Sequence, residues 1–144
     1  MRFKVLTLKD YAKKKVADYV TRAYKEKLDV VVSDKHMPRI NHACHYNADA
    51  LVESGDAACV IECFIVNGDK SVTLHHINMG FDMKVFDCTL GYRWSGCDYL
   101  LSKVIKRSHK IDPAGILNSK KREICKLAGL SSLTVKLVGI HNIL

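Results

Sequence analysis

Residues 59–92 read CVIECFIVNGDKSVTLHHINMGFDMKVFDCTLGY, and this stretch decides the fold. It contains three runs rich in β-branched and apolar residues, at 59–66, 71–79 and 84–92, and this composition favours strands. Asn67-Gly68-Asp69 separates the first two runs and is a strong hairpin signal. We therefore expect a three-stranded antiparallel meander in the middle of the chain.

Helical patterns lie on both sides of this meander. Apolar residues recur at helical spacing from Leu8 to Leu28, and residues 44–54 and 113–128 also have helical character. Gly55 is a natural stop for the helix at 44–54. The remaining segments are a loosely alternating, strand-like run at 1–8, a short apolar run at 28–34, a loop at 35–43, and a run at 98–106 that fits either a strand or a helix.

These patterns predict a small α+β domain, in which a helix that begins at Cys44 packs on an antiparallel sheet. A length of 144 residues suits one domain. We expect a single domain over residues 1–144, with 108–144 forming either part of it or a C-terminal helical appendage.

Composition excludes several classes of protein. With 48% hydrophobic and 26% charged residues the chain is a globular protein. No stretch approaches the roughly 20 apolar residues of a membrane span, and the N-terminus does not resemble a secretory signal. The six cysteines are then expected to be free thiols. We expect a cytoplasmic protein that does not contact a membrane.

The net charge of +8 is concentrated at the two ends of the chain. Residues 1–27 hold nine basic and three acidic residues, residues 28–100 hold five and ten, and residues 101–144 hold nine and two. This distribution has two interpretations. Each end forms a solvated basic helix, or the basic ends bind nucleic acid or another polyanion.

Cys44 is the candidate nucleophile because it lies where a loop becomes a helix. The amides and dipole of a helix N-terminus stabilise a thiolate and lower the pKa of a cysteine there. An activated cysteine also requires a base and a group that orients the base. His75 or His76 on the second run, and Asp87 on the third, are the candidates for these roles.

The register of the meander decides between the two histidines. Residues opposite each other in an antiparallel pair share a face, and a shift of one residue reverses the faces. A turn with an odd number of residues, such as 80–82, places His75 opposite Asp87. An even turn, such as 80–83, places His76 there. The sequence leaves this choice open.

The order CHYNA, HHIN and FDCTLG resembles the papain-like and transglutaminase-like cysteine enzymes, and small phage-encoded proteins share a form of this pattern. The resemblance covers about residues 44–91. It implies a papain-like core in which Cys44 is the nucleophile, His75 the general base and Asp87 its orienting residue. Ile77 and Cys88 depart from the pattern, which commonly has an aromatic residue and a proline at these positions.

The resemblance also implies roles for polar residues beside the triad. Asn78 and Thr89 fall at accompanying positions, and Asn41 is placed to donate a hydrogen bond to an oxyanion. The implied reaction is attack of Cys44 on an amide or ester carbonyl, followed by resolution of the thioester by water or an amine. The substrate would then be a protein or another amide-containing molecule, and no cofactor is implied.

Two alternatives compete with this prediction. The same cysteine, histidine and aspartate can be ordinary buried residues of a degenerate scaffold that binds a partner. A metal site would use His42, Cys44 and His45 with Cys59 and Cys63, but the pairs His-x-Cys-His and Cys-x3-Cys match zinc sites poorly. We therefore expect no metal.

A second motif lies near the C-terminus, where residues 124–139 read ICKLAGLSSLTVKLVG. This segment resembles the helix-turn-helix of bacterial repressors, with Gly129 in the turn and Ser131 as the N-cap. The resemblance implies phosphate contacts and base readout by Lys120, Lys121, Arg122, Thr134 and Lys136. The alternative is a structural element, either a helix pair or a helix followed by a strand at 134–140.

Overall fold

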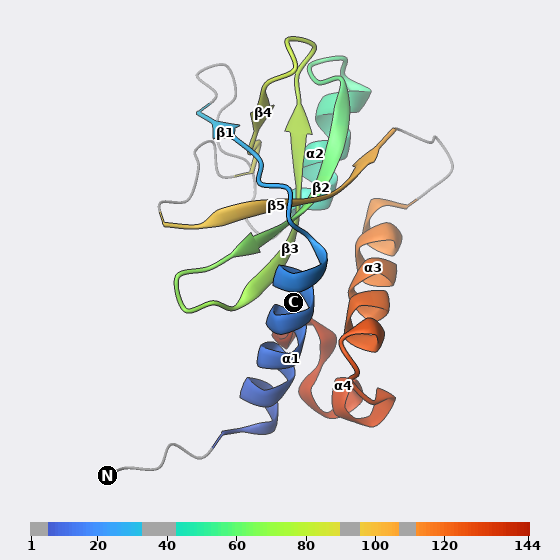
Figure 1. The fold of residues 1–144 in the computed structure, drawn as a ribbon. Helices are drawn as coiled ribbons and strands as arrows, with labels where there is room; N and C mark the ends of the chain where they lie inside the picture. Colours follow the sequence, from blue (N-terminus) through green and yellow to red (C-terminus); the bar gives the residue numbers. More distant parts are fainter. Residues whose placement is uncertain (1–5, 33–42, 90–95, 107–111) are drawn as a thin grey trace.

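The structure is a computed structural model that describes residues 6–32, 43–89, 96–106 and 112–144. Within these residues the chain forms an α+β fold with four α-helices and a five-stranded mixed sheet (Figure 1). The helices are α1 (Leu8–Ala23), α2 (Cys44–Glu53), α3 (Pro113–Leu127) and α4 (Ser132–Val138), followed by a 3-10 helix, η1 (Ile140–Asn142). The strands are β1 (Val30–Val31), β2 (Cys59–Val66), β3 (Val72–Met79), β4 (Val85–Phe86) and β5 (Asp98–Ile105).

The sheet has the strand order β1-β4-β3-β2-β5. β2 and β3 form the expected antiparallel hairpin, which closes where the Asn67 N–H donates to the Ser71 carbonyl. β4 continues the antiparallel meander, β5 pairs antiparallel with the other edge of β2, and β1 pairs parallel with β4. The meander is therefore confirmed, but its third strand has only two residues, Val85 and Phe86.

The two faces of the sheet bury different clusters, because side chains alternate along each strand. Phe64 and Leu74 join a core cluster that contains residues of α1, α3 and the C-terminal segment. Val60 and Phe86 pack in a second cluster with buried residues of α2. On the opposite face Ile77 belongs to a third cluster, which includes buried residues of β1, β2 and β5.

The helices cover one face of the sheet in two groups. Figure 1 shows α1, α3 and α4 gathered around one end of the hairpin, whereas α2 lies along the other part of β2 and β3. α1 begins at a capping box, in which Thr7 and Asp10 exchange hydrogen bonds. α3 begins after Asp112, whose carboxylate accepts from two backbone N–H groups of the first turn. α2 and α3 are in contact, and this contact brings the C-terminal part of the chain to the candidate site.

Several elements differ from the sequence prediction. The first helix ends at Ala23, and Lys27 forms an isolated bridge with Leu100. Residues 98–105 are a strand, which settles the ambiguity of that run. Residues 132–138 are a helix, so a strand at 134–140 was wrong. Most of the expected strand at 1–8 and of the loop at 35–43 lies outside the described residues.

Among the described residues, no helix combines the length and the apolar character that crossing a membrane requires.

Candidate active site

Cys44 is the first residue of α2 and lies beside an open edge of β3. β4 pairs with β3 only at Asn78 and Met79, so β4 does not cover the β3 edge at His75 and His76. There the His76 backbone N–H acts on the Cys44 sulfur and helps to lower the pKa of the thiol. The N-cap residue of α2 is Ala43, which has no side-chain acceptor for the amides of the first turn. The thiol and these amides therefore lie together at one end of the helix.

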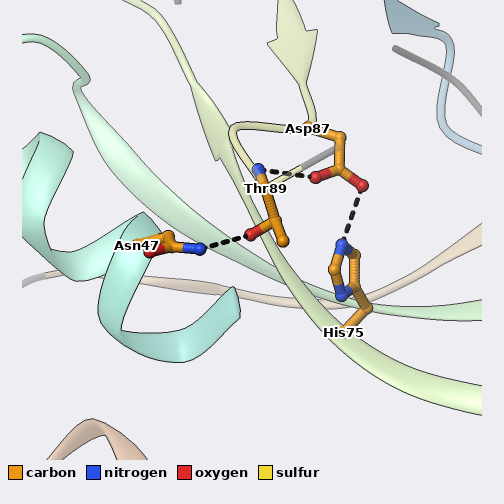
Figure 2. Close-up of polar contacts among 4 residues, drawn as sticks. All are labelled: Asn47, His75, Asp87 and Thr89. Atoms are coloured by element: carbon orange, nitrogen blue, oxygen red, sulfur yellow. Dashed lines mark hydrogen bonds and ion pairs between the residues drawn. The ribbon is translucent and has the colours of Figure 1, made fainter. Parts of the chain in front are cut away.

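His75 connects the thiol to a buried carboxylate. His75 Nε2 lies 2.7 Å from Asp87 Oδ2, and the Asp87 side chain is fully buried (Figure 2). His75 and Cys44 also act on each other: His75 lowers the pKa of the Cys44 thiol, and Cys44 raises the pKa of His75. Because Asp87 engages Nε2, Nδ1 is the ring nitrogen that remains for the thiol. The structure thus brings the three predicted triad residues together in the order Cys44, His75, Asp87.

The register that produces this contact is neither of the two that the sequence analysis considered. Met79 pairs with Val85, so the turn holds the five residues 80–84. Five is odd, which places Asp87 on the same face as His75. In an extended ladder, however, Ile77 and not His75 would stand opposite Asp87. His75 reaches Asp87 as a diagonal neighbour two residues along β3, a distance that long side chains span.

A second hydrogen-bonded connection returns from Asp87 to α2. Asp87 Oδ1 accepts from the Thr89 backbone N–H at 2.9 Å, and the Thr89 hydroxyl accepts from Asn47 Nδ2 at 3.1 Å. Figure 2 shows Asn47 on the helix pointing at Thr89, and Asp87 lying between Thr89 and His75. Asn47 is three residues after Cys44 on the same helix. The polar contacts therefore form a closed ring that begins and ends on α2.

The charges in this ring favour an ionised cysteine. Burial opposes ionisation of Cys44, but the hydrogen bond and charge of His75 and the His76 N–H together lower the pKa of the thiol. Burial also disfavours a charged His75, yet hydrogen bonds to Asp87 and Cys44 raise the pKa of His75 to about 10. Both shifts favour a Cys44 thiolate paired with a His75 imidazolium, as in other cysteine sites of depressed pKa.

His76 has a different environment from His75. It stands opposite Glu62 on β2, and His76 Nε2 lies 3.6 Å from Glu62 Oε2 with both side chains buried. Glu62 also accepts a hydrogen bond of 2.7 Å from the Ser102 hydroxyl on β5. Burial would raise the pKa of Glu62, but His76 and Ser102 lower it. His76 therefore lies beside a buried carboxylate on the helix-covered face, and His75 is the histidine that binds Asp87.

The reactive side chains open into a cavity of about 500 Å³. Cys44, His75 and Thr89 line one part of it. Residues from the C-terminal part of the chain, including Lys121 and His141, line another part. The triad is therefore buried without being sealed, as a site for a small part of a larger substrate requires.

Of the two predicted asparagines, Asn78 belongs to the described residues, and it does not line the cavity. Asn78 is fully buried, and its amide donates to the carbonyls of Ala48 and Cys59. It ties α2 to β2 and does not line the cavity. Asn41 lies outside the described residues.

Two residues of the site were not assigned to it from the sequence. Asn47 belongs to the quoted CHYNA motif, and its position one helical turn after Cys44 was the available signal. Lys121 had no such signal, because only the packing of α3 against α2 brings it to the cavity.

The C-terminal motif has the local geometry of two helices joined by a turn. Gly129 has a positive φ of 81°, and the Ser131 hydroxyl caps α4 by accepting from the Thr134 N–H. Its basic residues do not form one exposed row. Lys121 is buried, and only 12% of the Lys120 side chain is exposed, because it lies over the Tyr24 ring and pairs with Glu123. Both lysine side chains are thus largely covered by the protein itself, and their phosphate contacts stay a prediction.

The other residues predicted to contact nucleic acid lie at or near the surface. Arg122 and Lys136 are exposed, and Thr134 is half-buried with its hydroxyl 2.9 Å from that of Ser131. Arg122 and Lys136 line a separate hollow between α3 and α4. Nothing in their contacts identifies a phosphate or a base as the ligand.

The residues considered for a metal site are dispersed in the described structure. Among described residues there is no group of three or more histidine, cysteine, aspartate or glutamate side chains that could hold a metal ion. Burial raises the pKa of the Cys59 thiol, and that of Cys63 well above its usual range. His42 lies outside the described residues.

Comparison of the chain with protein families, curated proteins and solved structures finds no significant match.

Proposed function

We propose that this protein is a cysteine-dependent hydrolase or acyl transferase that acts on an amide or peptide-type bond. The observation that carries the proposal is that Cys44 and His75 line the same cavity while Asp87 binds the His75 ring from behind at 2.7 Å. A nucleophile, a base within hydrogen-bonding reach and a group that orients the base are the parts that this chemistry requires. The substrate is a protein or another amide-containing molecule.

The first step is attack of the Cys44 thiolate on the carbonyl carbon of the substrate. A carbon–sulfur bond forms, and the electron pair of the carbonyl π bond moves to the oxygen. The first-turn amides of α2 supply hydrogen bonds and the positive end of the helix dipole to this oxyanion. Because Ala43 has no side-chain oxygen, no N-cap acceptor competes for these amides.

The second step releases the amine and leaves a thioester on Cys44. The carbon–nitrogen bond breaks as the His75 imidazolium gives its proton to the departing nitrogen. Neutral His75 then accepts a proton from water or from an acceptor amine as that group attacks the thioester carbonyl. The thiolate leaves, and the ion pair is restored. Water gives hydrolysis and an amine gives acyl transfer.

Asp87 is a positioning residue in this scheme. Its carboxylate fixes the orientation of the His75 ring through Nε2 and stabilises the charged form of the imidazole. Thr89 and Asn47 hold the carboxylate in turn. Such a supporting shell keeps the reacting groups in one geometry before the substrate binds.

The order and chemistry of these parts support a papain-like arrangement. The quoted motifs place a cysteine at the start of a helix, then a histidine on a strand, then an aspartate after the next strand. The six cysteines, all of them free, suit a reducing compartment, so we place the reaction in the cytoplasm.

Alkylation kinetics test the proposal without a known substrate. Iodoacetamide labelling from about pH 5 to about pH 9, with each cysteine mapped by mass, should show that Cys44 reacts well below the ordinary thiol pKa of about 8.5. The buried thiols Cys59 and Cys63 are internal references, since their pKa values are raised. A His75→Ala variant should lose the fast phase, whereas His76→Ala should keep it wherever the variant remains folded.

A second measurement tests acyl transfer itself. Incubation with an activated ester such as p-nitrophenyl acetate should add one acetyl group at Cys44, detected as a thioester that hydroxylamine removes. A Cys44→Ala variant should not form it. Slow labelling of Cys44 that follows an ordinary thiol titration, with no thioester, would overturn the proposal.

A further inference from the structure

We propose that Lys121 selects substrates that carry a carboxylate next to the bond attacked by Cys44. This inference rests on the proposed acyl chemistry and adds a substrate class to it. Lys121 is on α3, and its side chain lines the same cavity as Cys44 and His75. The geometry therefore places a cation beside the reacting groups and away from the exposed surface of the protein.

Lys121 is unusually buried for a lysine. Only 8% of the residue is exposed. Burying an ammonium group costs several kcal/mol unless another group compensates its charge, and burial lowers the pKa of Lys121 accordingly. α3 also has an exposed face, and a lysine on that face would reach water without this cost. The cost indicates that the charge has a use inside the cavity.

No carboxylate in the described segments lies within ion-pair distance of Lys121. The ammonium group lies 3.5 Å from Nδ1 of His141, which also lines the cavity. An imidazole carries no negative charge and so does not neutralise the ammonium group. A ligand carboxylate would complete this arrangement with a charge-assisted hydrogen bond, which is stronger than a neutral one.

The rest of the cavity also favours an anion. The described residues that line it include Lys13 of α1, and none of them is an aspartate or a glutamate. Lys13 already lies near the Asp69 carboxylate, whose pKa it helps to lower. Asp87 is fully buried and bound to His75. Lys121 is consequently the cation in this cavity that a substrate would neutralise.

Cys44 lines the same cavity, and the negative charge of its thiolate partly offsets the lowering of the lysine pKa, as Cys125 also does. Acylation removes this negative charge, because the thioester is neutral. A carboxylate on the acyl group would continue to balance the positive charge of the Lys121 ammonium group after the thioester has formed. This argument predicts selection of a negatively charged acyl donor over a neutral one of the same size.

Two alkylating reagents test this inference directly. Iodoacetate and iodoacetamide both react when the thiolate displaces iodide from the CH2 carbon, and they differ in carrying a carboxylate or a neutral amide. The ratio of their rate constants at Cys44 cancels the fraction of thiolate, which both reactions share. In a Lys121→Met variant this ratio should fall about tenfold, the size of one buried charge-assisted contact.

Matched variants make the result specific. Met fills a similar volume and is easily buried, so Lys121→Met should fold. Lys121→Arg should keep most of the preference because it retains the charge. Lys126→Gln removes the same charge from an exposed position on α3 outside this cavity and should leave the ratio unchanged. Circular dichroism verifies the fold of each variant.

Each remaining outcome separates the inference from the proposed function. If Lys121→Met slows both reagents equally, the lysine serves the thiolate, and selection of a carboxylate is overturned. An unchanged ratio overturns it as well. If iodoacetamide reacts slowly with wild-type Cys44 at neutral pH, the proposed function fails, but the ratio remains measurable near about pH 8.5, where an ordinary thiol is half ionised.

Peptide substrates then identify the source of the carboxylate. Peptides that carry Glu or Gln beside the cleaved bond test an acidic side chain, and peptides ending in a free acid or an amide test a terminal carboxylate. In either case the preference should disappear in Lys121→Met.

Discussion

Asn47 on α2 donates a hydrogen bond of 3.1 Å to the hydroxyl of Thr89, which follows β4. This bond joins the helix that carries the nucleophile to the segment that carries Asp87. It is a connection between Cys44 and Asp87 that does not pass through the His75 ring. The Asn47–Thr89 bond therefore helps to fix the distance between Cys44 and Asp87, the two ends of the triad.

An Asn47→Ala variant should therefore alter the reactivity of Cys44 as well as the stability of the fold. We expect the onset of alkylation to move to higher pH, because the His75–Cys44 pair is held less well, and the free energy of unfolding to fall by about 1 kcal/mol. The pH profile of labelling and a urea titration measure the two effects. Thr7→Ala is the control, since it removes the N-cap of α1, a comparable loss of stability, and Thr7 does not line the cavity of Cys44. An equal shift in both variants would show that Asn47 acts through stability alone.

Asp87→Asn should reduce acyl transfer by about 10²–10⁴-fold while keeping the volume of the side chain. An amide at this position cannot compensate a charged imidazole, so the pKa of His75 falls and the ion pair with Cys44 weakens. Formation of the Cys44 thioester provides the rate, and the pH profile of iodoacetamide labelling provides an independent check. An unchanged profile would contradict the role given to Asp87.

The raised pKa of His75 predicts a broad pH window for the ion pair. As the pH rises, the thiolate forms when the lowered pKa of Cys44 is passed, and the imidazolium persists until about pH 10. The ion pair is lost below the first value by protonation of sulfur and above the second by deprotonation of His75. Thiolate absorbance, measured as the difference between wild type and Cys44→Ala, and the NMR signals of the His75 ring follow the two limits. A His75 titration near its ordinary value of about 6.5 would rule out the ion pair.

The buried pair of Glu62 and His76 should contribute to stability rather than to reactivity. Removing the imidazole in His76→Ala leaves the Glu62 carboxylate buried with only the Ser102 hydroxyl, which should cost about 3–5 kcal/mol. Replacing both residues, as in Glu62→Gln with His76→Leu, should restore part of this loss. Denaturant unfolding of the single and double variants measures it. Fast labelling of Cys44 in the folded fraction of each variant is expected, and its loss would assign His76 to the reaction.

Local signals predicted the hairpin and the three long helices well. Asn67-Gly68-Asp69 determined the β2–β3 turn, and Gly55, with a positive φ of 81°, marks the end of α2 as expected. These features depend on residues that are close together in the sequence. The same holds for Ser131, whose capping bond favours a helix over a strand at 132–138.

Features that depend on long-range geometry were not predictable in the same way. The sequence left the length of the turn after β3 open, and a turn of five residues makes His75 and Asp87 diagonal neighbours rather than opposite ones. Lys121 lies between two basic residues in the sequence, a pattern typical of phosphate contacts. Only the contact between α3 and α2 shows that it faces the cavity.

The shortness of β4 has a consequence for how this sheet is used. A longer third strand would satisfy the backbone groups of β3 up to the hairpin turn and would leave no room for a sulfur atom at the His76 N–H. Because pairing stops after two residues, part of the β3 edge stays unpaired, and the proposed active site lies beside it. Proteins usually protect such edges from pairing with other chains. A designed extension of β4 should therefore stabilise the sheet and at the same time abolish the reactivity of Cys44.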